Sequence, residues 1–294
     1  MTRLVALFRS EFISGAFSLM GKTWLKYIVL YLIQLVISII AMIPLFLSFL
    51  NFDFIGELAD NPEMLQENPD MILKLFSLDG DISAMIVAGI LFLVFILLLA
   101  SWQINACLKL NEAVILEKPS DIGTILGKSF DSMLMRLFSA YLVIMVVYLA
   151  NIGLAVAIGY YASIALGVIA GLSGMVFMIR FSLIPACIVH GRMPVGEAIS
   201  HGLSLITVRR MFILLLAGII FIAAMFVASL IISLFSFIFL LIPLLGLLIQ
   251  MAIQLAFSGA INALTLGALS GLYYRWNDAP AMEDDLSSHL VQGS

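Results

Sequence analysis

The 294-residue chain is 63% hydrophobic and only 11% charged, and its formal net charge is −4. Soluble domains usually carry about a quarter charged residues, so a water-soluble fold of this composition would expose large apolar patches. The composition therefore excludes an ordinary soluble protein and predicts an all-α, polytopic bundle of transmembrane helices. Basic residues are too few and too scattered to predict a nucleic-acid-binding surface.

The hydropathy pattern predicts about six spans in three hairpins. A helix needs about 20 apolar residues to cross a bilayer, and apolar runs lie at residues 27–50, 82–108, 137–158, 160–189, 211–235 and from 237 onward. We expect a single integral membrane domain over residues 1–276, with an acidic loop at 51–81, and an acidic tail at 277–294. Pro243 and Gly246 interrupt the sixth span, which is therefore expected to be long or broken.

A segment with apolar residues at helical spacing precedes each predicted hairpin. These segments cover residues 13–24, 122–134 and 195–206. Each carries polar residues on its other side, which is typical of an amphipathic helix that lies in the membrane interface. The strings Gly15–Leu19 and His201–Leu205 are similar. An internal threefold repeat and a chance match of short apolar strings both explain that similarity.

The distribution of charge predicts an orientation. Lys and Arg gather before the first span, between the second and third, and between the fourth and fifth, whereas residues 51–81 hold eight acids and Lys74 as the only base. The positive-inside rule then places both termini and the amphipathic helices in the cytoplasm, with the acidic loop outside a bacterial inner membrane. The loop lacks the alternating ligands and central glycine of a calcium loop, so we expect no metal there.

Two stripes of small residues step by four, one in the fourth span and one in the sixth. Small residues at this spacing let helix backbones approach closely in lipid. We predict that Gly167, Gly171, Gly267 and Gly271 pack against other helices of the same chain, and a homo-oligomer interface is the alternative. The full stripes are Gly159, Ser163, Gly167 and Gly171, and Gly259, Ala263, Gly267 and Gly271.

Arg180 is the one charged residue that the pattern places inside a span, where an unpaired charge costs at least a few kcal/mol. One interpretation is that its side chain extends to the cytoplasmic surface with help from carbonyls at a helix end. The other is an anion or lipid-phosphate contact inside the bundle. Arg209 and Arg210 follow at the membrane boundary. We predict lipid or anion contacts at these three arginines, with Arg180 pointing toward the helix at 195–206.

Signals for catalysis are weak. Cys187, His190 and His201 could be imagined as a metal set, but their positions and the missing carboxylates argue against one, and we expect Cys107 and Cys187 to be core residues. The sequence has no Gly-rich phosphate loop, no paired carboxylates inside a span and no nucleophile motif. We therefore expect a protein that is not an enzyme and that holds no cofactor or metal.

One stretch carries a resemblance, from Arg180 to Arg210. A span ends in an Arg-aromatic pair, and a proline, a hydrophobic pair, a short polar turn and a Glu-Ala-x-Ser helix follow, at Arg180, Phe181, Pro185, Ile188, Val189, Gly191, Glu197, Ala198 and Ser200. The stretch resembles the glycerophosphoryl diester phosphodiesterase membrane-domain family and related bacterial polytopic membrane proteins. In that family the membrane domain can be joined to a soluble phosphodiesterase, which no hydrophilic stretch here is long enough to hold. The resemblance implies a fold and a membrane location, not hydrolysis.

Two functions fit this sequence. The first is a non-enzymatic membrane organiser or assembly partner, whose cytoplasmic surface helices bind lipid or protein. The second is a transporter or channel-like permease component. Its path would be lined by the polar residues of the spans, which are Gln34, Asn105, Asn151, Arg180, Gln250, Gln254 and Asn262. The two functions differ in whether these side chains share one cavity or enter separate helix contacts, and the sequence favours the organiser slightly.

Overall fold

The computed structural model describes residues 3–48, 56, 82–239 and 243–277. Among these residues every regular element is a helix and no strand occurs, which confirms the all-α bundle. Within the described residues, five helices are long and apolar enough to cross a membrane, or up to six if one bent pair counts as a span. The chain is therefore a multi-pass membrane protein. Nearly all of the predicted acidic loop and acidic tail lies outside the described residues.

The chain divides into two compact units, Met1–Tyr31 with Ser101–Ser294, and Leu32–Ala100. The smaller unit holds the second half of helix α2 (Phe12–Ser48) and the first part of helix α5 (Ile82–Ile115). Its large apolar side chains are widely exposed, such as Ile40 at 61% and Leu91 at 64%. An apolar surface of this kind suits contact with lipid rather than water.

The N-terminal segment differs from the prediction. A short helix, α1 (Arg3–Ser10), comes first, and the expected amphipathic helix at 13–24 is continuous with the first span in α2. No proline lies between Phe12 and Ile43, so nothing in the sequence separates the two parts. Of the apolar residues in this segment, Ala16 and Leu19 are buried, whereas Ile13 and Phe17 are exposed.

The second predicted surface helix is shorter than expected. Helix α6 covers only Ile122–Ser129, and α7 (Ser132–Tyr161) starts directly after it. Asp131 explains the break, because its side chain accepts a hydrogen bond from the amide of Met133 and so caps the first turn of α7. Phe130, one of the apolar residues at helical spacing in the predicted segment 122–134, lies between the two helices and is 69% exposed.

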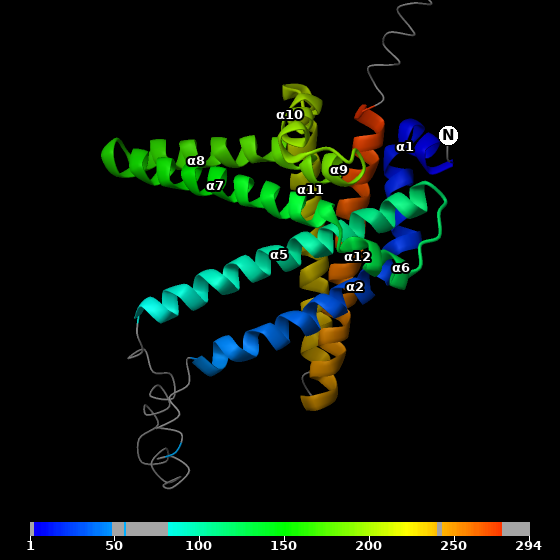
Figure 1. Cartoon of the computed structure of the whole chain (residues 1–294), viewed down its shortest axis with the longest axis horizontal. Helices are drawn as coiled ribbons and strands as arrows, with labels where there is room; N and C mark the ends of the chain where they lie inside the picture. The colour runs from blue at the N-terminus through cyan, green and yellow to red at the C-terminus, as the bar shows by residue number, and fades with distance from the viewer. Residues whose placement is uncertain (1–2, 49–55, 57–81, 240–242, 278–294) are drawn as a thin grey trace, which may run out of the picture. The chain divides into compact units, whose positions relative to one another are not determined.

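The fourth span, Ile164–Val189, contains a 3-10 turn. Helices α7 and α8 (Ile164–Met178) form a hairpin and lie side by side (Figure 1). A 3-10 turn, η2 (Ile179–Phe181), follows α8, and the chain resumes as α9 (Ile184–Val189). Arg180 therefore lies inside the fourth span, as predicted, in a 3-10 turn between two α-helical segments of the candidate span Ile164–Val189. Pro185 lies in the first turn of α9, where a proline is tolerated.

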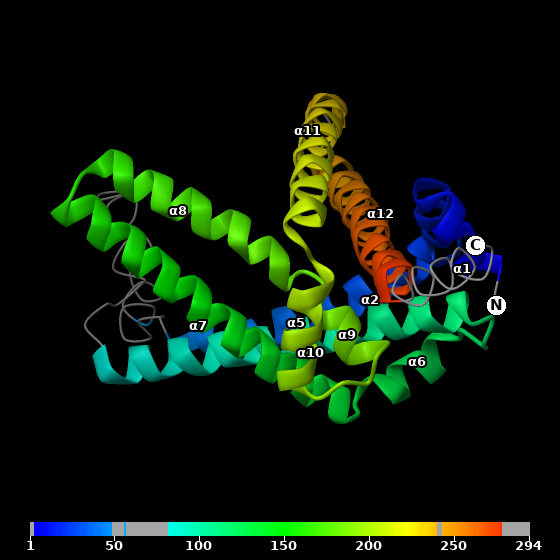
Figure 2. The ribbon, with the colours of Figure 1, turned by 90° about the horizontal axis from the view of Figure 1, so that it is seen from above.

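The last three helices begin with a sharp bend. Helix α10 (Val195–Leu205) is followed directly by α11 (Val208–Phe239), as Figure 2 shows. The two helices meet at an angle of 82°. Helix α12 (Pro243–Asn277) is continuous and 35 residues long, so of the two expectations for the sixth span the structure shows the long helix. Pro243 is instead the first helical residue, a position at which its missing N–H leaves no bond unmade.

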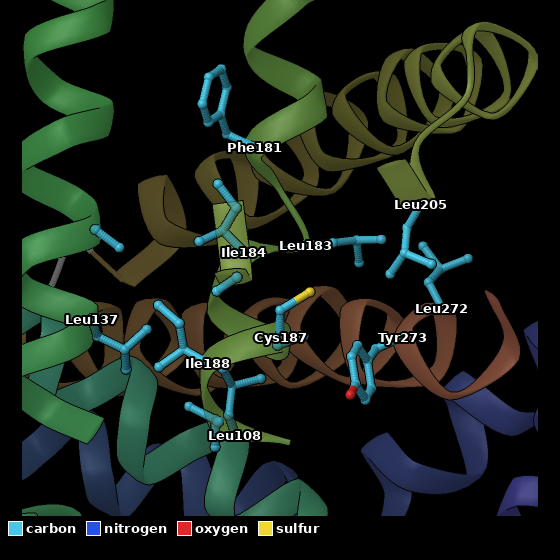
Figure 3. Close-up of a cluster of buried hydrophobic side chains, with 14 of the residues drawn as sticks. Leu108, Leu137, Phe181, Leu183, Ile184, Cys187, Ile188, Leu205, Leu272 and Tyr273 are labelled. Carbon is cyan, nitrogen blue, oxygen red and sulfur yellow. The ribbon is translucent and has the colours of Figure 1, made fainter. Parts of the chain in front are cut away.

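Helix α9 forms the centre of the largest hydrophobic cluster in the first unit. All six of its residues are buried, and Figure 3 shows Ile184, Cys187 and Ile188 among side chains of neighbouring helices. These neighbours include Leu137 of α7 and Tyr273 of α12. Both Cys107 and Cys187 are buried free thiols, which fits their predicted place in the core.

Candidate functional site

Arg180 connects the fourth span to α10. Its Nη2 donates a hydrogen bond of 3.0 Å to the carbonyl oxygen of Leu203, and its Cζ lies 5.8 Å from the centroid of the Phe177 ring. Carbonyls in the last turn of a helix lack an intrahelical partner and carry the negative end of the helix dipole. The guanidinium therefore stabilises the C-terminal end of α10, while its Nε is buried without a hydrogen-bond partner.

Arg210 binds the same helix end from α11. Its Nη1 donates to the carbonyl oxygen of Leu205 over 2.8 Å, and its Cζ lies 4.9 Å from the centroid of the Trp276 ring. Its neighbour Arg209 is exposed. The two arginines together neutralise the negative end of α10, which leaves Arg209 as the most accessible of the three predicted lipid or anion contacts.

A third contact ties α10 to the end of α12. His201 Nε2 and Asn277 Oδ1 are 2.8 Å apart. Helix α10 also buries Ala198, Gly202 and Leu205 against the first unit. The helix is therefore held along its length, while Glu197, Ser200 and Ser204 remain exposed.

The glycines of α8 lie against α7. A Cβ atom at Gly167 would be 2.6 Å from the Cα of Gly159 and 2.8 Å from the carbonyl oxygen of Ala155. At Gly171 the nearest atom to such a Cβ would be the Cβ of Ala155 at 3.6 Å, which is ordinary contact. Gly167 is thus the position at which the two backbones approach most closely, and any side chain there would force them apart.

The glycines of α12 face the N-terminal helices. A Cβ at Gly271 would overlap the ring of Phe8, and a Cβ at Gly267 would be 3.5 Å from Cδ2 of Leu19. Phe8 is fully buried at this contact. A glycine at 271 therefore provides the space into which an aromatic ring of α1 packs.

A buried polar cluster joins α5, α9 and α12. Ser270 Oγ donates to the carbonyl oxygen of Leu266 over 2.8 Å, which uses its only proton. The hydroxyl then accepts from Asn111 Nδ2 at 3.2 Å and from His190 Nε2 at 3.0 Å. This network assigns the proton of the neutral imidazole to Nε2. The pair has the spacing of a nucleophile and its base, but His190 is the donor here and cannot accept the serine proton.

His190 lies just after the fourth span, in contact with two aromatic rings. Ring centroids are 5.7 Å apart for Tyr273 and 5.3 Å apart for Tyr274. The residue as a whole is partly exposed, but its Nδ1 is buried with no hydrogen-bond partner. Burial lowers the pKa of His190 to about 3, so the ring is neutral at physiological pH.

The imagined metal set does not assemble. Within the described part of the chain, no three His, Cys, Asp or Glu side chains are grouped closely enough to hold a metal ion. His190 and His201 instead bind Ser270 and Asn277, and Cys187 is buried in the hydrophobic cluster.

A second polar network holds the junction of α6 and α7 against α5. Asn105 donates to the carbonyl oxygen of Ser129 at 2.8 Å and to Asp131 Oδ1 at 3.3 Å, and Lys109 Nζ lies 2.6 Å from Asp131 Oδ2. Burial raises the pKa of Asp131, but the hydrogen bonds and charge of Lys109, with the donors Asn105 and the amide of Met133, more than offset this and lower it overall. The carboxylate is thus ionised at neutral pH.

The other polar residues of the spans enter separate contacts. The amide of Asn151 lies against the backbone of Gly174, and Asn262 donates to the carbonyl oxygen of Ser258 in its own helix at 2.8 Å. Gln254 is exposed. Among the described side chains, these residues therefore do not line a shared path. The two remaining candidates are Gln34, which belongs to the other compact unit, and Gln250, whose side chain is not described.

Comparison with known proteins gives no relative: no family model, no curated protein and no solved structure matches this chain. The resemblance of the stretch from Arg180 to Arg210 therefore stays a prediction.

The two polar networks were missed from the sequence. His190 and Ser270 are 80 residues apart, and Lys109 and Asp131 are 22 apart. The available signal was weak: Ser101 to Asn111 is unusually polar for the end of a span. Such residues indicate contact with other helices, but they do not identify the partner.

Proposed function

We propose that the chain is a non-enzymatic membrane protein that organises lipids or a partner protein through its short helices α6 and α10. The observation that carries the proposal is the way α10 is held. Arg180, Arg210 and His201 fasten it at 82° to α11, and its exposed face is polar. A helix fixed this firmly offers a preorganised surface, which lowers the entropic cost of binding.

The expected location is a bacterial cytoplasmic membrane, with both termini in the cytoplasm. The support is the segregation of Lys and Arg into alternate loops. Cysteine labelling of intact cells with an impermeant reagent tests this orientation. A cysteine at Glu63 should react and one at Ser120 should not, and the opposite pattern would refute it.

Lipid analysis after purification in a mild detergent tests the proposed function. Anionic lipid should co-purify with the protein, and Arg209→Gln should lower the amount retained by roughly fivefold, since a basic residue near a membrane surface contributes about 1 kcal/mol. Arg275→Gln, which removes an exposed charge at the end of α12, is the matched control. The proposed organising function would be contradicted if the purified chain retained neither lipid nor a partner protein and if reconstituted vesicles showed solute flux.

A permease component is the second candidate, and the 3-10 turn η2 within the fourth span is the observation that favours it. Transporters use broken helices at their substrate sites, because unwound backbone is tolerated only where it lines a cavity or packs in protein. Two polar atoms near the break, Arg180 Nε and Ser182 Oγ, are buried without a partner. Vesicles that contain the protein would then take up solute. Uptake that is abolished by Arg180→Gln but unchanged by Arg209→Gln would favour this candidate.

A further inference from the structure

A basic recess lies where α5 ends beside α6. Its cavity has a volume of about 690 Å³, within the range of small-molecule sites. Residues from three parts of the chain line it: the end of α5, the segment through α6 to the start of α7, and the turn after α9. The charged side chains among them are Lys109, Glu112, Lys118, Lys128, Asp131 and Arg192.

The charges of the recess are not balanced. Asp131 is paired with Lys109 at 2.6 Å, and Glu112 lies 3.8 Å from Arg192 in a loose ion pair. Both acids are therefore already neutralised. Two ammonium groups, those of Lys118 and Lys128, have no ion-pair partner among the described residues, and both side chains are exposed. The recess thus carries four cationic side chains against two acidic ones.

The backbone is strained on both sides of the recess. Glu117 and Arg192 have φ values of 56° and 54°, and they are the described non-glycine residues with positive φ. This conformation costs energy for residues with side chains and persists only where surrounding contacts impose it. Such contacts are present, because the amide of Lys118 donates to Ala113 O at 2.8 Å and Arg136 Nη1 donates to Arg192 O at 2.9 Å. The strained turns bring Lys118 and Arg192 to the recess.

We propose that this recess binds a phosphate group. Lysine ammonium groups act as point charges toward phosphate, and a guanidinium can bind two of its oxygens. Arg192 is accessible to such a ligand, because its side chain is 69% exposed and its ion pair with Glu112 is long at 3.8 Å. The hydroxyl of Thr124, which also lines the recess, adds a further donor. The phosphate can come from an anionic lipid headgroup or from a soluble phosphate compound.

Phosphate binding beside α6 rests on the proposed function only where the phosphate belongs to a lipid headgroup. Binding of inorganic phosphate in detergent requires no membrane and no organising role. The two proposals can therefore fail separately.

The test uses the full chain and two double variants. Lys118→Gln with Lys128→Gln removes the uncompensated charges and leaves the backbone bonds of both residues in place. Arg3→Gln with Lys22→Gln is the matched control, because these residues line a different cavity of about 740 Å³ and the change in charge is the same. Affinity for inorganic phosphate is measured by calorimetry in an uncharged detergent, and affinity for vesicles is measured by flotation of the nanodisc-held protein. The vesicles are phosphatidylcholine alone or phosphatidylcholine with phosphatidic acid.

The recess variant should bind roughly 30-fold more weakly than the parent chain, since each surface charge contributes about 1 kcal/mol toward an anionic ligand, and the control variant should bind like the parent. If the recess variant loses affinity for inorganic phosphate, a soluble phosphate compound is sufficient as the ligand of the recess. Loss confined to the phosphatidic acid vesicles identifies the lipid headgroup as the source. The proposal is overturned if neither probe binds, or if the recess variant and the control variant bind equally well.

Discussion

Mild acid should destabilise the protein through His190. The folded chain keeps this imidazole neutral, because its Nδ1 is buried without a partner and its Nε2 donates to Ser270. The described groups in contact with the ring are Ser270, Tyr273 and Tyr274, and none of them carries a charge that would stabilise the imidazolium. Burial therefore lowers the pKa of His190 to about 3.

The sign and size of the effect follow from proton linkage. An unfolded chain binds the proton near pH 6.5, whereas the folded chain binds it only near pH 3. Between these values the unfolded state holds the extra proton, so stability is complete above pH 6.5 and is lost as the pH falls. From about pH 7.5 to about pH 5.5 the free energy of unfolding should fall by about 1.4 kcal/mol. The size of this change depends on the pKa of His190 in the unfolded chain, because the ring in the folded chain is neutral at both pH values.

Unfolding in mixed micelles of an uncharged detergent and SDS measures this change. His190→Gln removes the titrating group and should flatten the dependence between these two pH values, while His201→Gln, which changes a histidine bound to Asn277, should retain it. Asp131 does not interfere, because its lowered pKa confines its contribution to more acidic conditions. Equal stability of the parent chain at the two pH values, or an unchanged slope in His190→Gln, would show that water or the tyrosine rings stabilise the imidazolium.

Two further substitutions test the helix contacts. Gly167→Leu should lower the free energy of unfolding by about 1–3 kcal/mol, because a side chain there meets the backbone of α7 at 2.6 Å. Gly153→Leu in the same hairpin is the control, because a side chain there meets open space. Equal melting temperatures of the two variants would contradict the close approach of α7 and α8. Arg180→Ala should cost about 1.5–3 kcal/mol through the lost bond to Leu203, and Arg180→Glu should cost more because a carboxylate would face that carbonyl. Amide hydrogen exchange of α10 should accelerate in both Arg180 variants, and unchanged exchange would show that α10 does not depend on this contact.

The sequence predicts α10 well and the first surface helix poorly. At 195–206 a single helical face is apolar, and the structure buries Ala198, Gly202 and Ile206 of that face. At 13–24 several faces are apolar, because a helix in lipid can expose Ile13 and Phe17 as readily as bury them. Periodicity identifies the packed side of a helix only when water contacts the other side.

Breaks in the helices are also hard to predict from hydropathy alone. Residues 160–189 form one apolar run, and the interruption at Arg180 adds a charge but neither a glycine nor a proline at the break itself. The structure shows what the break achieves. The 3-10 turn η2 holds Arg180, whose guanidinium donates to the carbonyl of Leu203. The partner is a backbone atom of a distant segment, and no pattern of side chains marks it.

The cost of a charge in a membrane protein explains where the polar contacts of the first unit occur. They gather at helix ends: Arg180 and Arg210 at the end of α10, Asp131 at the start of α7, and His190 at the end of α9. Helix ends are where backbone carbonyls and amides lack partners, and the apolar surroundings make each unmade bond expensive. A polar side chain placed there satisfies the backbone and loses less hydration than it would at the middle of a span. Lysines without an ion-pair partner among the described residues, such as Lys118 and Lys128, are then the ones available to an external ligand.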